Sequence, residues 1–343
     1  MKRRVKGWPD DLDTALEFSS ANPFSISAPK NWDGKLEYTN GSGWKMWDGS
    51  AIASGEIENN HYIYLRGTGN SKITGTASSS AKWSIIGTNI ACNGDIDLLL
   101  DYSTVKSGNR PAMASYCYAN MFRDCTSLTA APSLPATTLA SYCYASMFFK
   151  CTSLTAAPSL PATTLANHCY SYMFYGWPSL TAAPSLPATT LASYCYASMF
   201  QGCTSLTAAP SLPATTLANH CYASMFYGCT SLTAAPSLPA TTLASYCYAS
   251  MFRDCTSLTA APSLPATTLK PDCYSYMFFN CKKIKLSTTA SGTYTKSYRI
   301  PKSGTGTTAS SALSYMFANT GGTFTGTPEI NTTYYLDESN TIV

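Results

Sequence analysis

The pattern of hydrophobic and polar positions repeats with a fixed period through the middle of the chain. The first set of cysteines is spaced by 26 residues, at Cys117, Cys143, Cys169, Cys195, Cys221, Cys247 and Cys273. A second set follows eight residues later, at Cys125, Cys151, Cys203, Cys229, Cys255 and Cys281, with Trp177 in the remaining place. A fixed period in this range is typical of solenoid proteins. The sequence therefore predicts six full copies and a partial seventh, from Cys117 to about Leu286.

Each copy contains two kinds of segment. The stretch "SLTAAPSLP" is short and punctuated by prolines, which predicts an extended arm and a turn. The stretch "ASYCYASMF" carries apolar residues at near-helical spacing and predicts a short helical turn. Stacked copies would align the extended arms as a parallel ladder about 4.8 Å apart, so that seven copies would span about 34 Å. The expected fold class is an α/β solenoid of 26-residue coils.

Identical residues at each period would form columns through such a stack, and we expect these columns to be the core. One column is Leu128, Leu154, Leu180, Leu206, Leu232 and Leu258, and another is Phe122, Phe148, Phe174, Phe200, Phe226, Phe252 and Phe278.

The repeated "MFYGCTSLT" and its variants resemble the "F-x-x-C-x-x-L" signature of bacterial leucine-rich repeats of the BspA type. The resemblance covers about half of the chain. The chain departs from that pattern in its additional cysteine column and its longer "AAPSLPATT" segment. The resemblance implies a leucine-rich-repeat solenoid with a binding function, because such repeats occur in surface adhesins and in predicted tail proteins of gut bacteriophages. It implies no particular ligand.

Three interpretations of the cysteines compete. Two cysteines of one copy would lie about 12 Å apart along a helical arm, too far for a disulfide, whereas cysteines of adjacent copies could lie about 5 Å apart. Zinc binding requires clustered ligands, but no C-x-x-C motif occurs and the three histidines, His61, His168 and His220, are scattered. Buried free thiols that serve as small apolar residues are the third interpretation, and the regular columns favour it. A catalytic thiol is disfavoured because such a group is singular.

The segments before and after the repeats have a different pattern of apolar and polar residues. Residues 1–108 alternate in runs such as "KLEYT", "HYIYLRG" and "WSIIG", which predicts an antiparallel β domain. Its five tryptophans are interpreted either as core or as a sugar-stacking platform: Trp8, Trp32, Trp44, Trp47 and Trp83. The repeats occupy residues 109–290, and residues 291–343 are expected to form a degenerate coil around "SYMF" and a C-terminal β cap.

Charge and hydropathy narrow the possible functions. Charged residues make up 12% of the chain and the net charge is +4, which disfavours a nucleic-acid surface. The basic start "MKRRVKGWPDD" lacks the apolar stretch of a signal peptide, and no run approaches 18 apolar residues. We therefore expect no membrane insertion, and a protein that works outside a cell would arrive another way, for example in a virion.

Positions at which the copies disagree are the candidate binding residues. One set follows the phenylalanine column: Phe149, Tyr175, Gln201 and Tyr227. The other precedes the first cysteine of each copy: Tyr142, His168, Tyr194, His220 and Tyr246. Side chains that differ are expected at the surface, and an aromatic-rich exposed column on a rigid scaffold is suited to binding. Drift on an idle surface is the alternative.

The sequence thus favours a non-enzymatic binding protein without metal or cofactor. We expect a phage tail adhesin that recognises a bacterial surface glycan or protein and contacts other subunits of a tail or surface assembly. The alternative is a structural spacer or docking subunit of a virion or cell-surface assembly. An enzyme acting on polysaccharide is disfavoured because no paired acidic residues recur in the repeats.

Overall fold

The computed structural model describes residues 7–343, which are mostly β structure with few helices. The chain divides into two compact units, Met1–Pro161 and Ala162–Val343. Each unit is described by itself below. The start "MKRRVK", interpreted above as lacking a signal peptide, lies outside the described residues.

The N-terminal unit begins with the antiparallel β structure that the alternating runs predict. Its larger sheet has the strand order β10-β9-β1-β7-β3-β4, and β6 also pairs with β7. These strands are β1 (Leu16–Ser20), β3 (Lys35–Thr39), β4 (Lys45–Met46), β6 (Gly55–Ile57), β7 (Asn60–Thr68), β9 (Ile90–Asn93) and β10 (Leu128–Ala130). A smaller sheet has the order β5-β2-β8, formed by β2 (Ser25–Ser27), β5 (Ile52–Ala53) and β8 (Ser84–Ile86). Only β9 and β10 pair in parallel among these strands.

Three short helices accompany the sheets in the described part of this unit: η1 (Leu12–Thr14), η2 (Ser79–Ala81) and α1 (Leu98–Lys106). The leucines at the start of α1 are buried. A Cβ atom on Gly67 of β7 would lie 1.6 Å from the Leu99 carbonyl oxygen. Only glycine therefore permits β7 and α1 to approach this closely.

Three of the five N-terminal tryptophans are core residues. Trp32, Trp47 and Trp83 are buried, and the ring of Trp47 lies 5.3 Å from Trp32 and 5.2 Å from Trp83. Because burial leaves no ring face for a ligand, these three cannot form a sugar-stacking platform. Trp44 is engaged differently: the Arg66 guanidinium lies 3.9 Å from its ring centroid, and its indole donates to Asp11.

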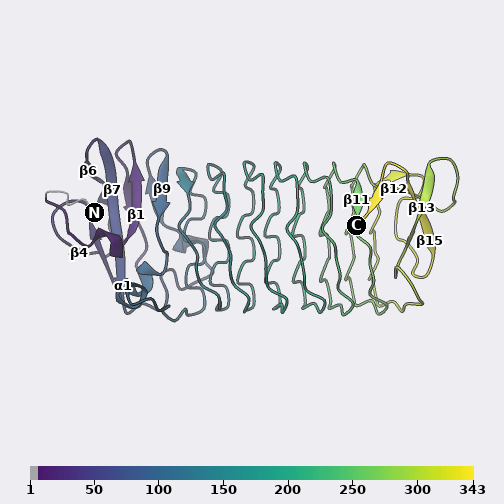
Figure 1. Ribbon diagram of the computed structural model, residues 1–343, viewed down its shortest axis with the longest axis horizontal. Coiled ribbons are helices and arrows are strands. Elements are labelled where there is room, and N and C mark those ends of the chain that lie inside the picture. The colour runs from purple at the N-terminus through teal and green to yellow at the C-terminus, as the bar shows by residue number, and fades with distance from the viewer. Residues whose placement is uncertain (1–6) are drawn as a thin grey trace. The chain divides into compact units, whose positions relative to one another are not determined.

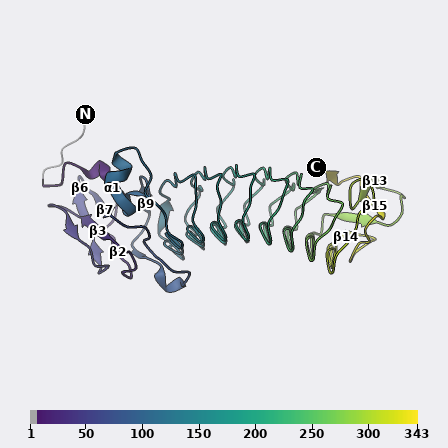
Figure 2. The ribbon, with the colours of Figure 1, turned by 90° about the horizontal axis from the view of Figure 1, so that it is seen from below.

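Successive copies of the repeat lie side by side in the C-terminal unit (Figures 1 and 2). The prediction of a short helical turn is wrong, because the stretch equivalent to "ASYCYASMF" forms consecutive turns rather than a helix. Its N–H groups alternate in partner. Those of Tyr170, Tyr172 and Phe174 donate to carbonyls 25 residues later, at 2.9–3.0 Å. Those of Ser171 and Met173 donate to carbonyls three residues earlier, at 3.2 Å.

A left-handed backbone at every fourth residue explains the absence of a helix. In one copy these residues are Tyr194, Ser198 and Gly202, with φ values of +57°, +53° and +76°. A right-handed helix requires negative φ throughout, so apolar spacing alone misidentified this segment. The hydrogen bonds between copies compensate for the unfavourable backbone at the non-glycine positions.

The extended arms pair less regularly than the sequence predicts. Isolated parallel bridges join Ala182, Ala208, Ala234 and Ala260 in succession, and others join Thr164 to Thr190 and Thr216 to Thr242. Prolines interrupt this arm in every copy and lack the N–H group that a continuous ladder requires. Most hydrogen bonds between copies therefore come from the turn segments.

The columns expected to form the core are buried, which confirms that prediction. The leucines and phenylalanines are 0% exposed. In the C-terminal unit, the rings of Phe174, Phe200, Phe226, Phe252 and Phe278 stack at 5.7–5.8 Å. A parallel column of buried tyrosines stacks at similar distances: Tyr170, Tyr196, Tyr222, Tyr248 and Tyr274. Each fully buried Leu or Phe side chain contributes about 1.5–3 kcal/mol.

The C-terminal segment continues the stack after an insertion, as expected. The Tyr276 N–H donates to Ser314, and the ring of Phe317 lies 5.3 Å from that of Phe278. The strands of this region are β11 (Ala260–Ala261), β12 (Lys285–Ser287), β13 (Tyr294–Arg299), β14 (Gly321–Gly322), β15 (Thr333–Asp337) and β16 (Thr341–Ile342). Because the sheet order is β13-β15-β12-β14, β15 is an inner strand rather than an edge strand.

Candidate functional site

Positions that vary between copies lie at the surface of the turn segments. We name two sets after their residues: the Tyr/His column (Tyr142, His168, Tyr194, His220 and Tyr246) and the Phe/Tyr/Gln column (Phe149, Tyr175, Gln201 and Tyr227). All of these residues are half-buried except Tyr246, which is exposed. Tyr142 and Phe149 belong to the N-terminal unit and the others to the C-terminal unit.

The Tyr/His column is a continuous stack of rings within the C-terminal unit. Ring centroids are separated by 4.4 Å between His168 and Tyr194, 4.2 Å between Tyr194 and His220, and 4.5 Å between His220 and Tyr246. The planes differ by 8° or less. In the N-terminal unit, Tyr142 stacks on Tyr116 at 4.6 Å. The structure therefore brings four predicted residues together in the C-terminal unit, whereas in the N-terminal unit Tyr142 stacks on a tyrosine that was not predicted.

The alternation of Asn-His and Ser-Tyr pairs has a structural basis. The Asn167 side-chain oxygen accepts a hydrogen bond from the Ser193 N–H at 3.1 Å, and Asn219 accepts from Ser245 at 3.2 Å. Each asparagine thus satisfies a backbone donor of the next copy, where the equivalent residue is serine. Because the donor is a backbone N–H, which every residue except proline provides, these hydrogen bonds do not decide between a binding role and drift.

Stacking determines what this column can offer to a ligand. The faces of Tyr194 and His220 are covered by their neighbours, so only ring edges remain available. A ligand would therefore contact tyrosine hydroxyl and histidine imidazole groups there, each of which can donate and accept hydrogen bonds. Tyr246 is 39% exposed, and Asp272 rather than a ring occupies the next position.

Both histidines favour the neutral form. Burial lowers the pKa of His168 and of His220, and a charge on His220 would lower the pKa of His168 further. Neutral imidazole can both donate and accept a hydrogen bond. At neutral pH the column therefore carries no charge on its histidines.

The Phe/Tyr/Gln column carries aromatic rings in two of its three copies in the C-terminal unit. Tyr175 and Tyr227 occupy the same position two copies apart, and Gln201 lies between them in sequence order. Tyr172, which sequence reasoning missed, is 42% exposed, and its ring lies 6.1 Å from that of Tyr175. Comparing copies could have found it, because most equivalent residues are serines, such as Ser198.

The cysteines belong to the core beneath this face. All 14 are buried and free, which confirms the packing interpretation. In the second cysteine column, thiols donate to phenylalanine carbonyls of the preceding copy: Cys203 to Phe174 at 3.2 Å and Cys229 to Phe200 at 3.1 Å. Burial raises the pKa of the Cys203 thiol to about 12, so it is not a reactive nucleophile.

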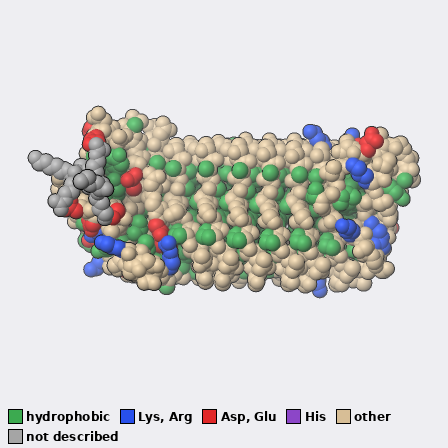
Figure 3. All heavy atoms as spheres, in the orientation of Figure 1, with side chains coloured by type: hydrophobic (Ala, Val, Ile, Leu, Met, Phe, Trp, Pro, Cys, Tyr) green, Lys and Arg blue, Asp and Glu red, His purple; other side chains and the backbone are tan. Residues whose placement is uncertain are grey.

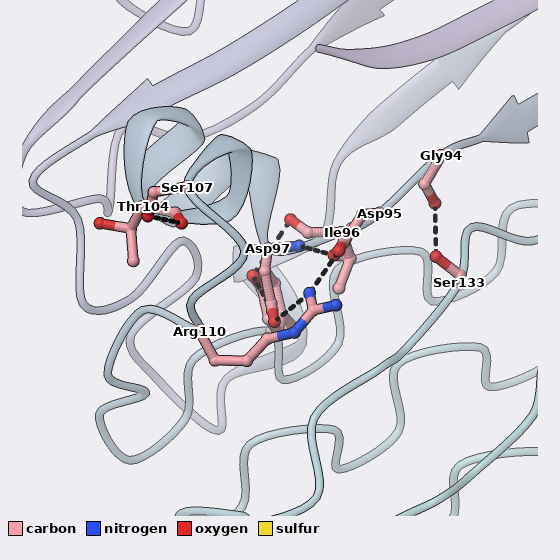
Figure 4. Close-up of polar contacts among 9 residues, drawn as sticks. Gly94, Asp95, Ile96, Asp97, Thr104, Ser107, Arg110 and Ser133 are labelled. Carbon is pink, nitrogen blue, oxygen red and sulfur yellow. Dashed lines mark hydrogen bonds and ion pairs between the residues drawn. The ribbon is translucent and has the colours of Figure 1, made fainter. Parts of the chain in front are cut away.

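A separate charged cluster lies in the N-terminal unit next to α1 (Figure 4). Arg110 forms an ion pair with Asp95, and its guanidinium lies 3.5 Å from Asp97 Oδ2. Asp97 is 1% exposed, and its Oδ1 accepts a hydrogen bond from Tyr118 at 3.2 Å. Burial, followed by the Asp95 charge, raises the pKa of Asp97 to about 6. Sequence reasoning missed this cluster, because only the fold buries Asp97.

Searches for other kinds of site give negative results within residues 7–343. No group of three or more His, Cys, Asp or Glu side chains is arranged to hold a metal ion. No helix in this part of the chain has the length and apolar character needed to cross a membrane. Comparisons with protein families, curated proteins and solved structures found no match to this chain.

Proposed function

We propose that the protein is a non-enzymatic binding protein whose turn segments form the binding face. The observation that carries this proposal is the separation of side chains in the repeats. The shared Leu, Phe and Cys columns are buried, whereas the variable aromatic and polar residues are half-buried or exposed at regular spacing. A scaffold that fixes its core and varies one face is suited to recognition.

The proposed architecture is a leucine-rich-repeat solenoid of the BspA type. The hydrogen bonds between equivalent turn segments and the stacked core columns support it. The proposed coil has a turn segment where a helix was expected. The resemblance to BspA-type repeats supports an adhesin of a phage tail, which would bind a bacterial surface glycan or protein. A virion tail or extracellular surface is accordingly the proposed location.

The chemistry of the repeats supports binding over catalysis. Residues 151–252 contain no Asp, Glu, Lys or Arg. The titratable imidazoles of this stretch, His168 and His220, are engaged in ring stacks. Pairs of carboxylates, which most glycoside hydrolases require, are therefore absent from this stretch.

Adsorption to bacterial cells tests this proposal. The double variant Tyr175→Ala/Tyr227→Ala removes two rings from the proposed face. The matched control, Thr163→Ala/Thr215→Ala, changes two exposed residues of the other arm in the same unit. We expect the tyrosine variant to lose adsorption while its circular dichroism and melting temperature are retained, and the threonine variant to adsorb normally.

A structural spacer would give the opposite result. Undiminished adsorption of the tyrosine variant would contradict the proposed binding face. If the variant also assembled normally into particles, the spacer interpretation would remain for the repeats.

A further inference from the structure

Arg253 is the first charged residue after the uncharged stretch of residues 151–252. It occupies the position equivalent to Tyr227 in the next copy, and Phe279 occupies it in the copy after that. From Arg253 to Lys302 the chain contains eight Lys or Arg residues and two Asp residues, with no Glu. In Figure 3 basic side chains, together with a few acidic ones, appear toward the end that carries the C-terminal strands. Charged residues therefore return to the variable positions at Arg253, followed by Asp254 and Asp272.

Aromatic rings hold the Arg253 guanidinium in place. Its central carbon lies 4.7 Å from the ring centroid of Phe279, 5.3 Å from that of Tyr227 and 5.7 Å from that of Tyr276. Such contacts are cation–π interactions. They restrict the side chain before any ligand arrives, which lowers the entropy cost of binding.

The hydrogen-bonding capacity of this guanidinium is unused by the described residues 7–343. Its Nε atom is buried and has no hydrogen-bond partner, and it forms an ion pair with Asp254 Oδ2 at 3.8 Å, beyond hydrogen-bond distance. Asp254 Oδ1 instead accepts a hydrogen bond from the Asn280 amide at 2.6 Å. The Arg253 side chain is 35% exposed, so part of it is accessible to a ligand.

Arg123 provides an internal comparison in the N-terminal unit. It has the same sequence position in its copy and is likewise followed by an aspartate, Asp124. Its Nη1 donates to the Asn120 side chain at 3.4 Å, however, and its guanidinium lies 3.7 Å from the Phe149 ring. The residue equivalent to Asn120 beside Arg253 is Ser250, which accepts a hydrogen bond from the Arg253 backbone N–H at 3.1 Å but none from its guanidinium. The two arginines thus share a sequence context but differ in unused donors.

We propose that Arg253 and its rings form a subsite for an acidic sugar, one that carries a carboxylate on its ring. The guanidinium fork matches a carboxylate in a bidentate geometry. The neighbouring Tyr276 ring stacks on Tyr315 at 5.1 Å, and Tyr315 is 54% exposed. A sugar ring can therefore pack against an aromatic surface while its carboxylate reaches Arg253. This inference rests on the proposed binding function and specifies its ligand class.

Binding of the full chain to oligogalacturonate tests the subsite. The methyl ester of the same oligosaccharide is the neutral ligand control. We expect the acid to bind more tightly than the ester, by about 10–100-fold, because hydrogen bonds to charged groups contribute about 1.5–3 kcal/mol. Arg253→Gln should reduce acid binding to the level of the ester. Arg253→Lys should give an intermediate affinity, because it keeps the charge but loses the fork.

Arg123→Gln is the protein control and should leave the preference for the acid unchanged. An unchanged preference in Arg253→Gln, with circular dichroism and melting temperature retained, would overturn the inference. So would an equal loss in Arg123→Gln. Tighter binding of a poly(glycerol phosphate) chain than of the acid would show that phosphate, not a sugar carboxylate, is the ligand chemistry, and would also overturn it.

Cell adsorption separates failure of this inference from failure of the proposed function. If the acid and the ester bind equally while adsorption still depends on Tyr175 and Tyr227, the acidic-sugar subsite is wrong and the binding function stands. If adsorption is independent of those tyrosines as well, both proposals fail.

Discussion

Replacing Asp97 with asparagine should remove a pH-dependent component of the stability of the N-terminal unit. Asp97 is 1% exposed and lies beside Asp95, and Arg110 and Tyr118 only partly compensate its charge. Its pKa is raised from 3.8 to about 6, so the folded state binds the proton more tightly than the unfolded state does. Asparagine has nearly the same shape and no charge, which makes Asp97→Asn the appropriate perturbation.

The sign and size follow from this pKa difference. As pH falls from 7 through about 6 toward 3.8, Asp97 becomes protonated in the folded state first, which stabilises the fold. A difference of about two pKa units corresponds to about 3 kcal/mol, of which little is lost to solvent screening because the group is buried. Relative to Asp97→Asn, the wild-type protein should therefore be about 2 kcal/mol less stable at pH 7 than at pH 4, because part of the full difference appears only below pH 4.

Tryptophan fluorescence during urea unfolding is a suitable assay, because five of the six tryptophans precede residue 109. Unfolding free energies are measured for both proteins between pH 4 and pH 7, and their difference removes the contribution of other carboxylates. Asp101→Asn is the control. The pKa of Asp101 is lowered to about 2 by hydrogen bonds from Ser103, Thr104 and Gly69 that outweigh its desolvation, so its contribution is lost only below about pH 4. If the free energy of unfolding depended on pH equally for wild type and Asp97→Asn, the reasoning would be refuted. Ionised Asp97 would then not destabilise the folded state.

Three further outcomes follow from the repeats. Thiol reagents at pH 8 should leave the native protein unmodified, because its cysteines are buried and the pKa of Cys169 and of Cys203 is raised to about 12. Mass spectrometry should show 14 modifications only after denaturation. Rapid labelling of the native protein would contradict this expectation. Tyr196→Phe should raise the free energy of unfolding by about 1 kcal/mol, because the buried Tyr196 hydroxyl has no hydrogen-bond partner among residues 7–343. Thermal unfolding measures this change, and destabilisation by the substitution would indicate an unrecognised partner. The imidazole protons of His168 and His220 should titrate below pH 6.5 in NMR spectra, because burial favours the neutral form, and a midpoint above 6.5 would be inconsistent with that environment.

Periodicity in the sequence determined much of this protein. The columns of Leu, Phe and Cys follow from the 26-residue period, because residues that every copy shares can be buried in every copy. The same comparison placed Tyr194 and His220 at the surface, since their identities alternate along the chain. Alternating polarity likewise predicted an antiparallel β domain before residue 108, including the run that forms β3.

Tertiary structure decided what periodicity could not. The turn segment has apolar residues at helical spacing, but hydrogen bonds between copies favour a left-handed backbone at residues such as Ser198, so no helix forms. The enclosure of Tyr194 between two imidazoles, the unused donors of Arg253 and the raised pKa of Asp97 all depend on neighbours far away in the sequence. A local pattern predicts which side chains are buried, whereas the hydrogen-bond partners and charge state of a side chain depend on the groups that folding brings beside it.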